Sequence, residues 1–133
     1  MANIPADLRY TREHEWARLE DDGNLSVGIT DFAQEQLGDI VYLDLPEPGA
    51  SVTGGEPMGE VESTKSVSDI YSPVSGEVVE TNTESRDNPA QVNQEPYGEG
   101  WLVIIKPADK SAFDSLLTSE EYDRLLLDEA GGA

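Results

Sequence analysis

The apolar residues of this chain fall in short runs that alternate with glycine, proline and charged residues. Runs rich in Val, Ile, Leu and Tyr between turn-forming residues are typical of β-strands separated by tight connections. The pattern therefore predicts a mainly β protein. Its expected strands cover residues 24–29, 39–45, 57–62, 66–71, 76–81 and 100–106.

Helical signals are fewer and lie apart from the predicted strands. Thr30 can cap a short helix that ends at Gly38, because a hydroxyl suits the first position of a helix and glycine suits its end. Thr118 and Glu121 have the spacing of a capping box, which predicts a C-terminal helix. We expect residues 128–133 to form a frayed tail.

Two parts of the sequence resemble each other. Gly-Asp-Ile-Val and Glu-Pro-Met-Gly-Glu in residues 38–60 are answered by Gly-Glu-Val-Val and Glu-Pro-Tyr-Gly-Glu in residues 76–99. Such a repeat predicts two similar β units that pack face to face, since neither could bury its apolar side alone. Chance similarity between short segments rich in Gly and Pro is the alternative. Lys65 lies between the two units, where an exposed connection is expected.

The size and composition of the chain are those of one folded domain. It has 133 residues, of which 37% are hydrophobic, with two Trp and five Tyr. This is enough apolar material to build a core, so the high acidity does not indicate disorder. We therefore expect a single domain over residues 1–133.

The charge of the chain is strongly negative. It has 8 Lys and Arg residues against 28 Asp and Glu residues, a net charge of -20. Such a surface repels phosphate backbones and anionic lipids, which argues against nucleic acid and membranes as partners. The beginning of the chain has no basic and then apolar leader, and we expect a cytoplasmic protein. A cytosol of high salt is the favoured explanation of the acidity, and an ordinary acidic protein is the alternative.

Cysteine is absent, which excludes disulfides, thiol nucleophiles and thiolate metal sites. Any redox sulfur must therefore come from a cofactor, and no metal site is predicted. Lys65 is one of only three lysines and lies among small hydroxyl residues. A lysine amine is a frequent target of covalent modification, although a solvated surface lysine is the simpler interpretation from this segment alone.

The segment around Lys65 resembles the lipoyl-attachment segment of the glycine cleavage system H protein. It reads Glu-Ser-Thr-Lys over residues 62–65 and Ser-Asp-Ile-Tyr-Ser-Pro-Val-Ser-Gly-Glu-Val over residues 68–78. The resemblance covers nearly the whole chain, and the order and spacing of its parts make it specific. Its other parts are His14-Glu15-Trp16 and residues 27–31, 37–41, 45–49 and 96–102.

The resemblance implies a fold and a function. The fold is a barrel-sandwich hybrid of the lipoyl/biotinyl type, with two small antiparallel sheets, short peripheral helices and a C-terminal helix. Lys65 would carry lipoate and shuttle an aminomethyl group between enzymes. These partners are a pyridoxal-phosphate glycine decarboxylase, a tetrahydrofolate-dependent aminomethyltransferase, dihydrolipoamide dehydrogenase and a lipoate-attaching enzyme. That enzyme would recognise Gly49, Glu62 and Gly76, and the chain itself would be a carrier protein and not an enzyme.

The resemblance also implies where the arm would dock and where this chain differs. Glu15, Ser68, Asp69 and Tyr71 are the candidate docking residues, since a carboxylate can pair with the cationic aminomethyl group. Biotin is not expected, because methionines usually flank a biotinylated lysine and Lys65 has Thr and Ser as neighbours. Many H proteins have histidine where this chain has Phe32, so any docking role of that histidine does not transfer to it.

Two other functions are compatible with parts of the sequence. A lipoyl domain of a 2-oxoacid dehydrogenase would have a similar fold, but such domains are shorter and tethered to further domains. A small hydrolase-like enzyme could use His14, the only histidine, with a nearby carboxylate. No recognisable nucleophile accompanies His14 in the sequence, so a structural role is favoured for it.

Overall fold

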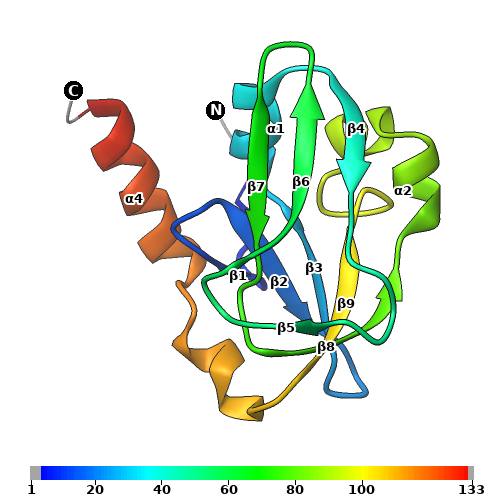
Figure 1. Cartoon of the computed structure of the whole chain (residues 1–133). Helices are drawn as coiled ribbons and strands as arrows, with labels where there is room; N and C mark the ends of the chain where they lie inside the picture. The colour runs from blue at the N-terminus through cyan, green and yellow to red at the C-terminus, as the bar shows by residue number, and fades with distance from the viewer. Residues whose placement is uncertain (1–3, 132–133) are drawn as a thin grey trace.

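Two antiparallel β-sheets form the body of the molecule, of which the computed structural model describes residues 4–131 (Figure 1). The large sheet has six strands and the small sheet has three. In spatial order, the large sheet consists of β1 (Arg9–Tyr10), β2 (Glu15–Leu19), β3 (Leu25–Ile29), β9 (Val103–Pro107), β8 (Gly76–Thr81) and β5 (Ser51–Val52). The small sheet consists of β4 (Ile40–Asp44), β6 (Pro57–Ser63) and β7 (Val67–Tyr71). The predicted mainly β fold with two antiparallel sheets is confirmed.

Alternation of side chains explains why the small sheet packs on one side only. In β6, Val61 and Ser63 are buried while Glu60 and Glu62 are exposed. Successive side chains of a strand point to opposite faces, so this sequence gives one apolar and one charged face. The apolar face covers the core, and the charged face is left to solvent.

The core lies between the sheets and continues under the C-terminal helix. Leu43, Val61 and Ile70 of the small sheet pack with Ile29 of β3 and Leu102 in one buried cluster. Full burial of one such side chain contributes about 1.5–3 kcal/mol to the free energy of folding. A second cluster lies within the large sheet and includes Leu25, Val27, Val78, Val103 and Ile105. A third joins the C-terminal helix to the first strands and consists of Leu8, Tyr10, Trp16, Tyr122 and Leu126.

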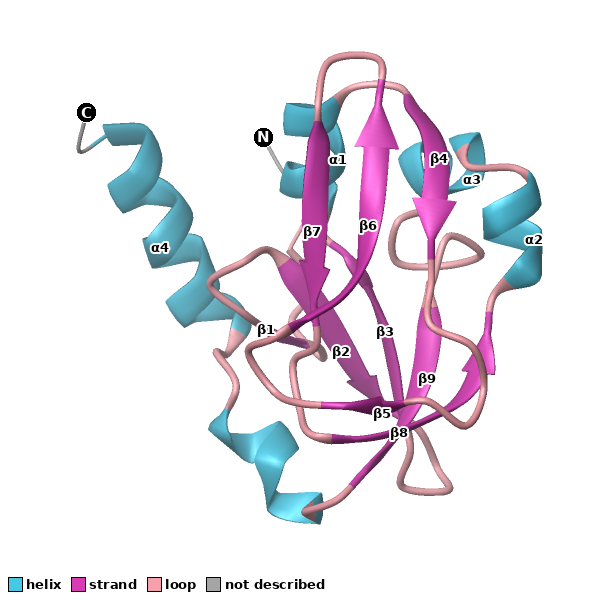
Figure 2. Ribbon diagram, viewed as in Figure 1, coloured by secondary structure: helices cyan, strands magenta, loops and turns pink. Residues whose placement is uncertain are grey.

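Short helices surround the sheets (Figure 2). They are α1 (Asp31–Leu37), α2 (Thr83–Asp87), α3 (Ala90–Gln94), the 3₁₀ helix η1 (Lys110–Ser115) and α4 (Ser119–Gly131). Thr30 caps α1 by accepting from the Ala33 N–H, and Gly38 ends it, as predicted. Helices α2 and α3 lie beside β4, and α4 packs against β1. Among residues 4–131, no helix combines the length and apolarity needed to cross a membrane.

The predicted internal repeat is wrong as a structural repeat. Residues 38–60 contribute to three strands, but their counterpart continues differently after β8. Val92 lies in α3, Glu95 caps the end of that helix, and residues 96–99 form turns. Short segments rich in Gly and Pro can resemble each other in composition, but the structure that each adopts depends on the residues against which it packs.

Several element boundaries also differ from the prediction. Strands β1 and β2 are not evident in the apolar pattern, because β2 begins with a buried carboxylate, Glu15. The last strand begins at Val103, so Trp101 precedes it. Helix α4 includes residues 128–131, which extends it beyond the point where a frayed tail was expected. Residues 132 and 133 lie outside the described part of the chain.

Candidate functional site

Lys65 lies at the tip of the hairpin that joins β6 to β7 (Figure 1). The Ser63 hydroxyl accepts hydrogen bonds from the backbone N–H groups of Lys65 and Ser66, both at 3.1 Å. The Ser63 N–H donates to the Ser66 carbonyl at 2.8 Å and closes the turn. The Ser63 hydroxyl thus stabilises a tight turn that has no Asn-Gly pair. Lys65 is exposed, so its amine is accessible.

The outer face of the small sheet continues from Lys65 as two rows of exposed side chains. Residues opposite each other in neighbouring strands form each row. The first row consists of Tyr42, Glu62 and Val67, and the second of Asp44, Glu60 and Asp69. Like charges in such positions repel, so the three carboxylates of the second row destabilise the sheet unless a cation approaches them.

Ser68 and Asp69 do not converge. They are consecutive in β7 and therefore point to opposite faces of the sheet. Asp69 lies on the outer face with Val67 and Tyr71, whereas Ser68 shares the inner side with the buried Ile70. The structure thus separates one candidate docking residue, Ser68, from the others.

Glu15 is a buried carboxyl group that connects the two sheets. It is 1% exposed, although it belongs to the most hydrophilic class of residues. Its Oε1 accepts from the Thr11 hydroxyl at 2.6 Å, and its Oε2 accepts from the backbone N–H of Tyr71 at 3.1 Å. Burial raises the pKa of Glu15 from 4.5 to about 8, against the opposing effect of these hydrogen bonds. The raised pKa therefore favours the protonated form of this carboxyl group at neutral pH.

Glu15 and Tyr71 line a cleft of about 320 Å³ beside the end of β7 that is remote from Lys65. Ser72, Pro73 and Leu117 also line it. Tyr71 lies six positions after Lys65, at the far end of β7, so the two are separated by up to about 20 Å at the rise of an extended strand. The lysine side chain alone cannot span this distance, so only a long attached arm could bring a reactive group from the hairpin tip to the cleft.

His14 takes part in a network of structural contacts. Its Nδ1 lies 2.8 Å from the Tyr122 hydroxyl, which is also 2.7 Å from Oγ1 of Thr30. Its Nε2 lies 3.5 Å from a carboxylate oxygen of Glu129, and its ring centroid is 4.9 Å from that of Phe32. Burial, opposed by the charge of Glu129, lowers the pKa of His14. The histidine thus joins α4 to the start of α1, and Phe32 provides an apolar contact for it.

Gly49 and Gly76 do not flank Lys65. They lie near β5 and β8, at the opposite end of the molecule from the hairpin tip (Figure 1). Gly49 has a φ of 96° and donates its N–H to the Val78 carbonyl at 2.7 Å. A Cβ at Gly76 would lie 2.2 Å from the Lys106 carbonyl oxygen, so only glycine allows β8 and β9 to approach this closely. Both glycines therefore have structural reasons to be present.

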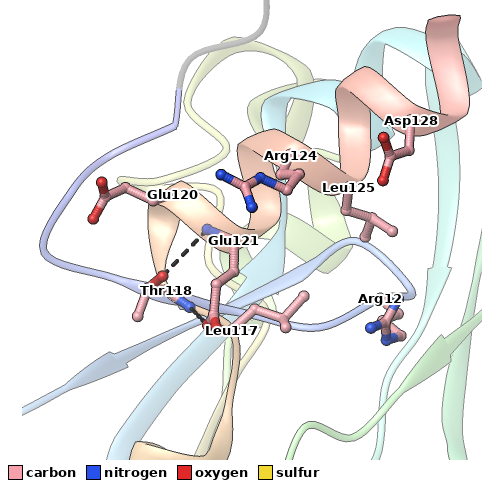
Figure 3. A pocket seen from close by; sticks show the side chains of 8 residues that line it. All are labelled: Arg12, Leu117, Thr118, Glu120, Glu121, Arg124, Leu125 and Asp128. Atoms are coloured by element: carbon pink, nitrogen blue, oxygen red, sulfur yellow. Dashed lines mark hydrogen bonds between the residues drawn. The ribbon is translucent and has the colours of Figure 1, made fainter.

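A separate cavity of about 500 Å³ lies beside α4 and contains none of the predicted site residues (Figure 3). The predicted capping box forms part of its wall. Thr118 Oγ1 accepts from the Glu121 N–H at 3.2 Å, and Glu121 Oε1 accepts from the Thr118 N–H at 2.9 Å. Arg12 and Leu117 line both this cavity and the Glu15 cleft, which makes the two neighbours.

Some residues that shape the site are not identifiable from the sequence. Ser63 and Thr11 look like ordinary polar residues, yet each hydroxyl organises a turn next to a candidate site residue. Asn93 is distant in sequence and binds the backbone near the hairpin tip. A Ser or Thr just before a tight connection is the one local signal available for the first two. Within residues 4–131, no group of three or more His, Cys, Asp and Glu side chains could hold a metal ion.

Comparisons with known proteins agree with this geometry. The family model described as "Glycine cleavage H-protein" matches residues 8–129. A glycine cleavage system H protein of Rubrobacter xylanophilus is 57% identical over 97% of this chain and 99% of its own length. Another from a Geobacillus species is 52% identical over 93% of this chain and 97% of its length. A crystal structure of a glycine cleavage system H protein from Mycobacterium marinum superimposes with a TM-score of 0.84 at 45% identity, covering 98% of this chain and 100% of that one.

A lysine on an exposed hairpin tip of two packed antiparallel sheets defines a carrier domain of the lipoyl/biotinyl type. The chain belongs to the glycine cleavage H-protein family. It is therefore a carrier component and not an enzyme. This excludes both alternatives, the hydrolase that would use His14 and the lipoyl domain of a 2-oxoacid dehydrogenase.

Proposed function

We propose that this protein is the lipoyl-bearing shuttle of a glycine cleavage system and that Lys65 carries the lipoate. Family membership supports a lipoyl carrier role in glycine cleavage. The observation that carries the assignment to Lys65 is its position at an exposed hairpin tip, within the segment that resembles the family's attachment site. Lys106 is also exposed but lies within β9, where its backbone pairs with β8. A cytoplasmic location remains part of the proposal.

The residues around Lys65 fit an attached acyl group. The amine is solvent-exposed, and the turn that carries it is closed by hydrogen bonds between Ser63 and the residues Lys65 and Ser66. When bound, lipoate supplies a dithiolane that accepts the aminomethyl group and is reduced in the process. The glycine decarboxylase would load this group, the aminomethyltransferase would pass its carbon to tetrahydrofolate, and dihydrolipoamide dehydrogenase would restore the disulfide. The protein's own contribution is to hold the attachment point rigidly while leaving the arm free.

We infer that the loaded arm docks along the outer side of β7 and ends in the cleft beside Glu15. Asp69 and Tyr71 lie on that side, and Tyr71 and Glu15 line the cleft. A cationic amine near Glu15 would favour its ionised form, so docking would release the proton that burial keeps on this carboxyl group. The apolar and partly enclosed walls would also keep water away from the end of the arm.

The assignment of Lys65 is tested by intact mass after incubation with a lipoate-attaching enzyme. We expect a gain of one lipoyl group on the wild type and on Lys106→Arg, and none on Lys65→Arg. Arginine keeps the positive charge but lacks the acylable primary amine, so Lys65→Arg should fold normally and support no glycine cleavage. Modification of the Lys65→Arg protein, or activity in the coupled assay, would contradict the assignment.

A further inference from the structure

The side chain of Lys65 lies against one particular backbone position. A Cβ built on Gly38 would be 3.1 Å from Cε of Lys65 and 3.7 Å from its Nζ. The end of the lysine stem therefore lies next to the residue that ends α1, close enough that a side chain there would push it aside by a few tenths of an ångström. Gly38 has a φ of 79°, a conformation that glycine adopts without strain.

This backbone position is fixed by contacts from two other parts of the chain. The Asn93 side-chain amide of α3 donates to the Gly38 carbonyl at 2.8 Å and to Oε1 of Gln34 at 2.9 Å. Its Oδ1 accepts from the Ile40 N–H at 2.9 Å. The next residue, Asp39, accepts at its carbonyl from the Thr64 N–H at 3.0 Å. The hairpin tip and the end of α1 are thus held together as one unit, which we call the lysine platform and define as Gln34, Gly38, Asp39 and Asn93.

We propose that Gly38 is a positioning residue for acylation of Lys65, and that Asn93 holds it in place. The inference rests on the proposed attachment of lipoate to Lys65. Acylation requires Nζ to lose a proton and attack the carbonyl carbon of an activated donor such as an acyl adenylate. An amide bond forms, the leaving group departs with its bonding electrons, and the nitrogen loses a second proton to solvent.

The contact with Gly38 restricts the directions from which Nζ can make this attack. A free lysine stem samples many rotamers, and about 2 kcal/mol of rotamer entropy is associated with such a side chain. Alignment of the reacting atoms before the reaction lowers the barrier, and small misplacements raise it. The platform therefore presents the amine in a narrow range of orientations to the acylating enzyme.

The test compares Gly38→Ala with Gly23→Ala. Gly23 has a similar φ of 89°, but a Cβ there would meet no atom within 4 Å. Both variants place an alanine at a positive φ, and only at Gly38, whose ψ of -154° is nearly confined to glycine, would the added Cβ also press on the lysine stem. We expect lipoylation of Gly38→Ala to be about tenfold slower than that of Gly23→Ala, below the roughly hundredfold loss that a 1 Å misplacement can cause. The loss should lie in kcat with KM little changed, because the surface of the sheet is unaltered.

A second variant and a chemical control separate positioning from damage to the fold. Asn93→Ala removes the support of Gly38 without adding a methyl group, and we expect the same direction of change. Acetylation by a small reagent, measured at Lys65 relative to Lys106 and Lys110 by peptide mapping, should not fall in either variant. An unchanged circular-dichroism spectrum and melting temperature would exclude a general loss of structure. If Gly38→Ala and Gly23→Ala are lipoylated at Lys65 at equal rates, Gly38 has no positioning role; if the wild type is not modified at Lys65, the proposed function itself is wrong.

Discussion

Two turns of this protein are built in the same way but place their side chains in opposite environments. In the β6–β7 turn the Ser63 hydroxyl accepts from the Lys65 and Ser66 N–H groups. In the β1–β2 turn the Thr11 hydroxyl accepts from the Glu13 and Glu15 N–H groups at 3.2 and 3.1 Å. Lys65 is nevertheless exposed, and Glu15 is 1% exposed.

The difference comes from what each turn packs against. The β1–β2 turn lies under α4 and beside α1, where His14 contacts Tyr122 and Phe32 and has a φ of 72°. A positive φ is strained for a residue with a side chain, and it persists here because the surrounding contacts determine it. The β6–β7 turn contacts the rest of the molecule mainly through Gly38 and Asp39. We infer that substitutions in the first turn affect folding, whereas substitutions in the second affect function.

The largest contrast is expected between two tyrosines. Tyr122 is fully buried, stacks on Tyr10 with ring centroids 4.7 Å apart, and binds His14 and Thr30. Tyr122→Ala should lower the free energy of unfolding by about 3–5 kcal/mol, as for other buried aromatic residues. Tyr42 of the small sheet is 56% exposed, and Tyr42→Ala should change it by no more than about 0.5 kcal/mol. Urea denaturation measures both, and equal losses would contradict the contrast between the buried contacts of the β1–β2 turn, in which Tyr122 takes part, and the exposed face of the small sheet.

The buried carboxyl group of Glu15 should make stability depend on pH. The unfolded state loses this proton near pH 4.5 and the folded state near pH 8, so folding takes up a proton between these values. The contribution of Glu15 to stability is therefore largest below pH 4.5 and falls by a few kcal/mol as the pH rises to 8.

Glu15→Gln removes this titration and keeps the size of the side chain. From pH 5 to pH 8, the unfolding free energy of the wild type should therefore fall relative to that of Glu15→Gln. Glu62→Gln is the control for the loss of one carboxyl group. A difference that does not vary with pH would mean that Glu15 titrates normally.

The two carboxyl groups that we expect to hold the aminomethyl-loaded arm differ in exposure, so their variants should respond differently to salt. Asp69→Asn and Glu15→Gln should each shorten the lifetime of the loaded arm against hydrolysis by about tenfold, since a hydrogen bond to a charged group contributes about 1.5–3 kcal/mol. Salt should diminish the effect of exposed Asp69 but not that of buried Glu15. Unchanged lifetimes in both variants would show that other groups protect the arm.

The smallest expected change in stability concerns the row of Asp44, Glu60 and Asp69 on the small sheet. With a net charge of -20, the protein should melt at a higher temperature in molar potassium chloride than in dilute buffer. Glu60 lies opposite both other carboxylates, so Glu60→Gln should raise the melting temperature in dilute buffer and reduce the gain from salt. A melting temperature that does not rise with chloride would remove the argument for a source with a high-salt cytosol.

The sequence predicts correctly those parts of the structure that depend on short-range interactions. The strands of the small sheet, the caps at Thr30 and Thr118, and the exposed position of Lys65 follow from residue periodicity, local hydrogen bonding and the resemblance to a known family. The sequence did not predict β1 or β2, and the repeat that it suggested is not a structural repeat. The strand β2 depends on burial of Glu15, and this requires donors from Thr11 and from Tyr71, a residue 56 positions away.

The amino-acid sequence by itself predicted a mainly β carrier and placed Lys65 in a segment that resembles a lipoyl-attachment site. Alternating apolar residues select sheets, and a lysine between two strands stays in water because nothing in its neighbourhood can replace its hydration. Only the tertiary structure decided that Glu15 is buried and has a raised pKa, that Ser68 and Asp69 point apart, and that Gly38 lies beside Lys65. Each of these depends on contacts between residues far apart in the chain, and such contacts exist only after the sheets have packed.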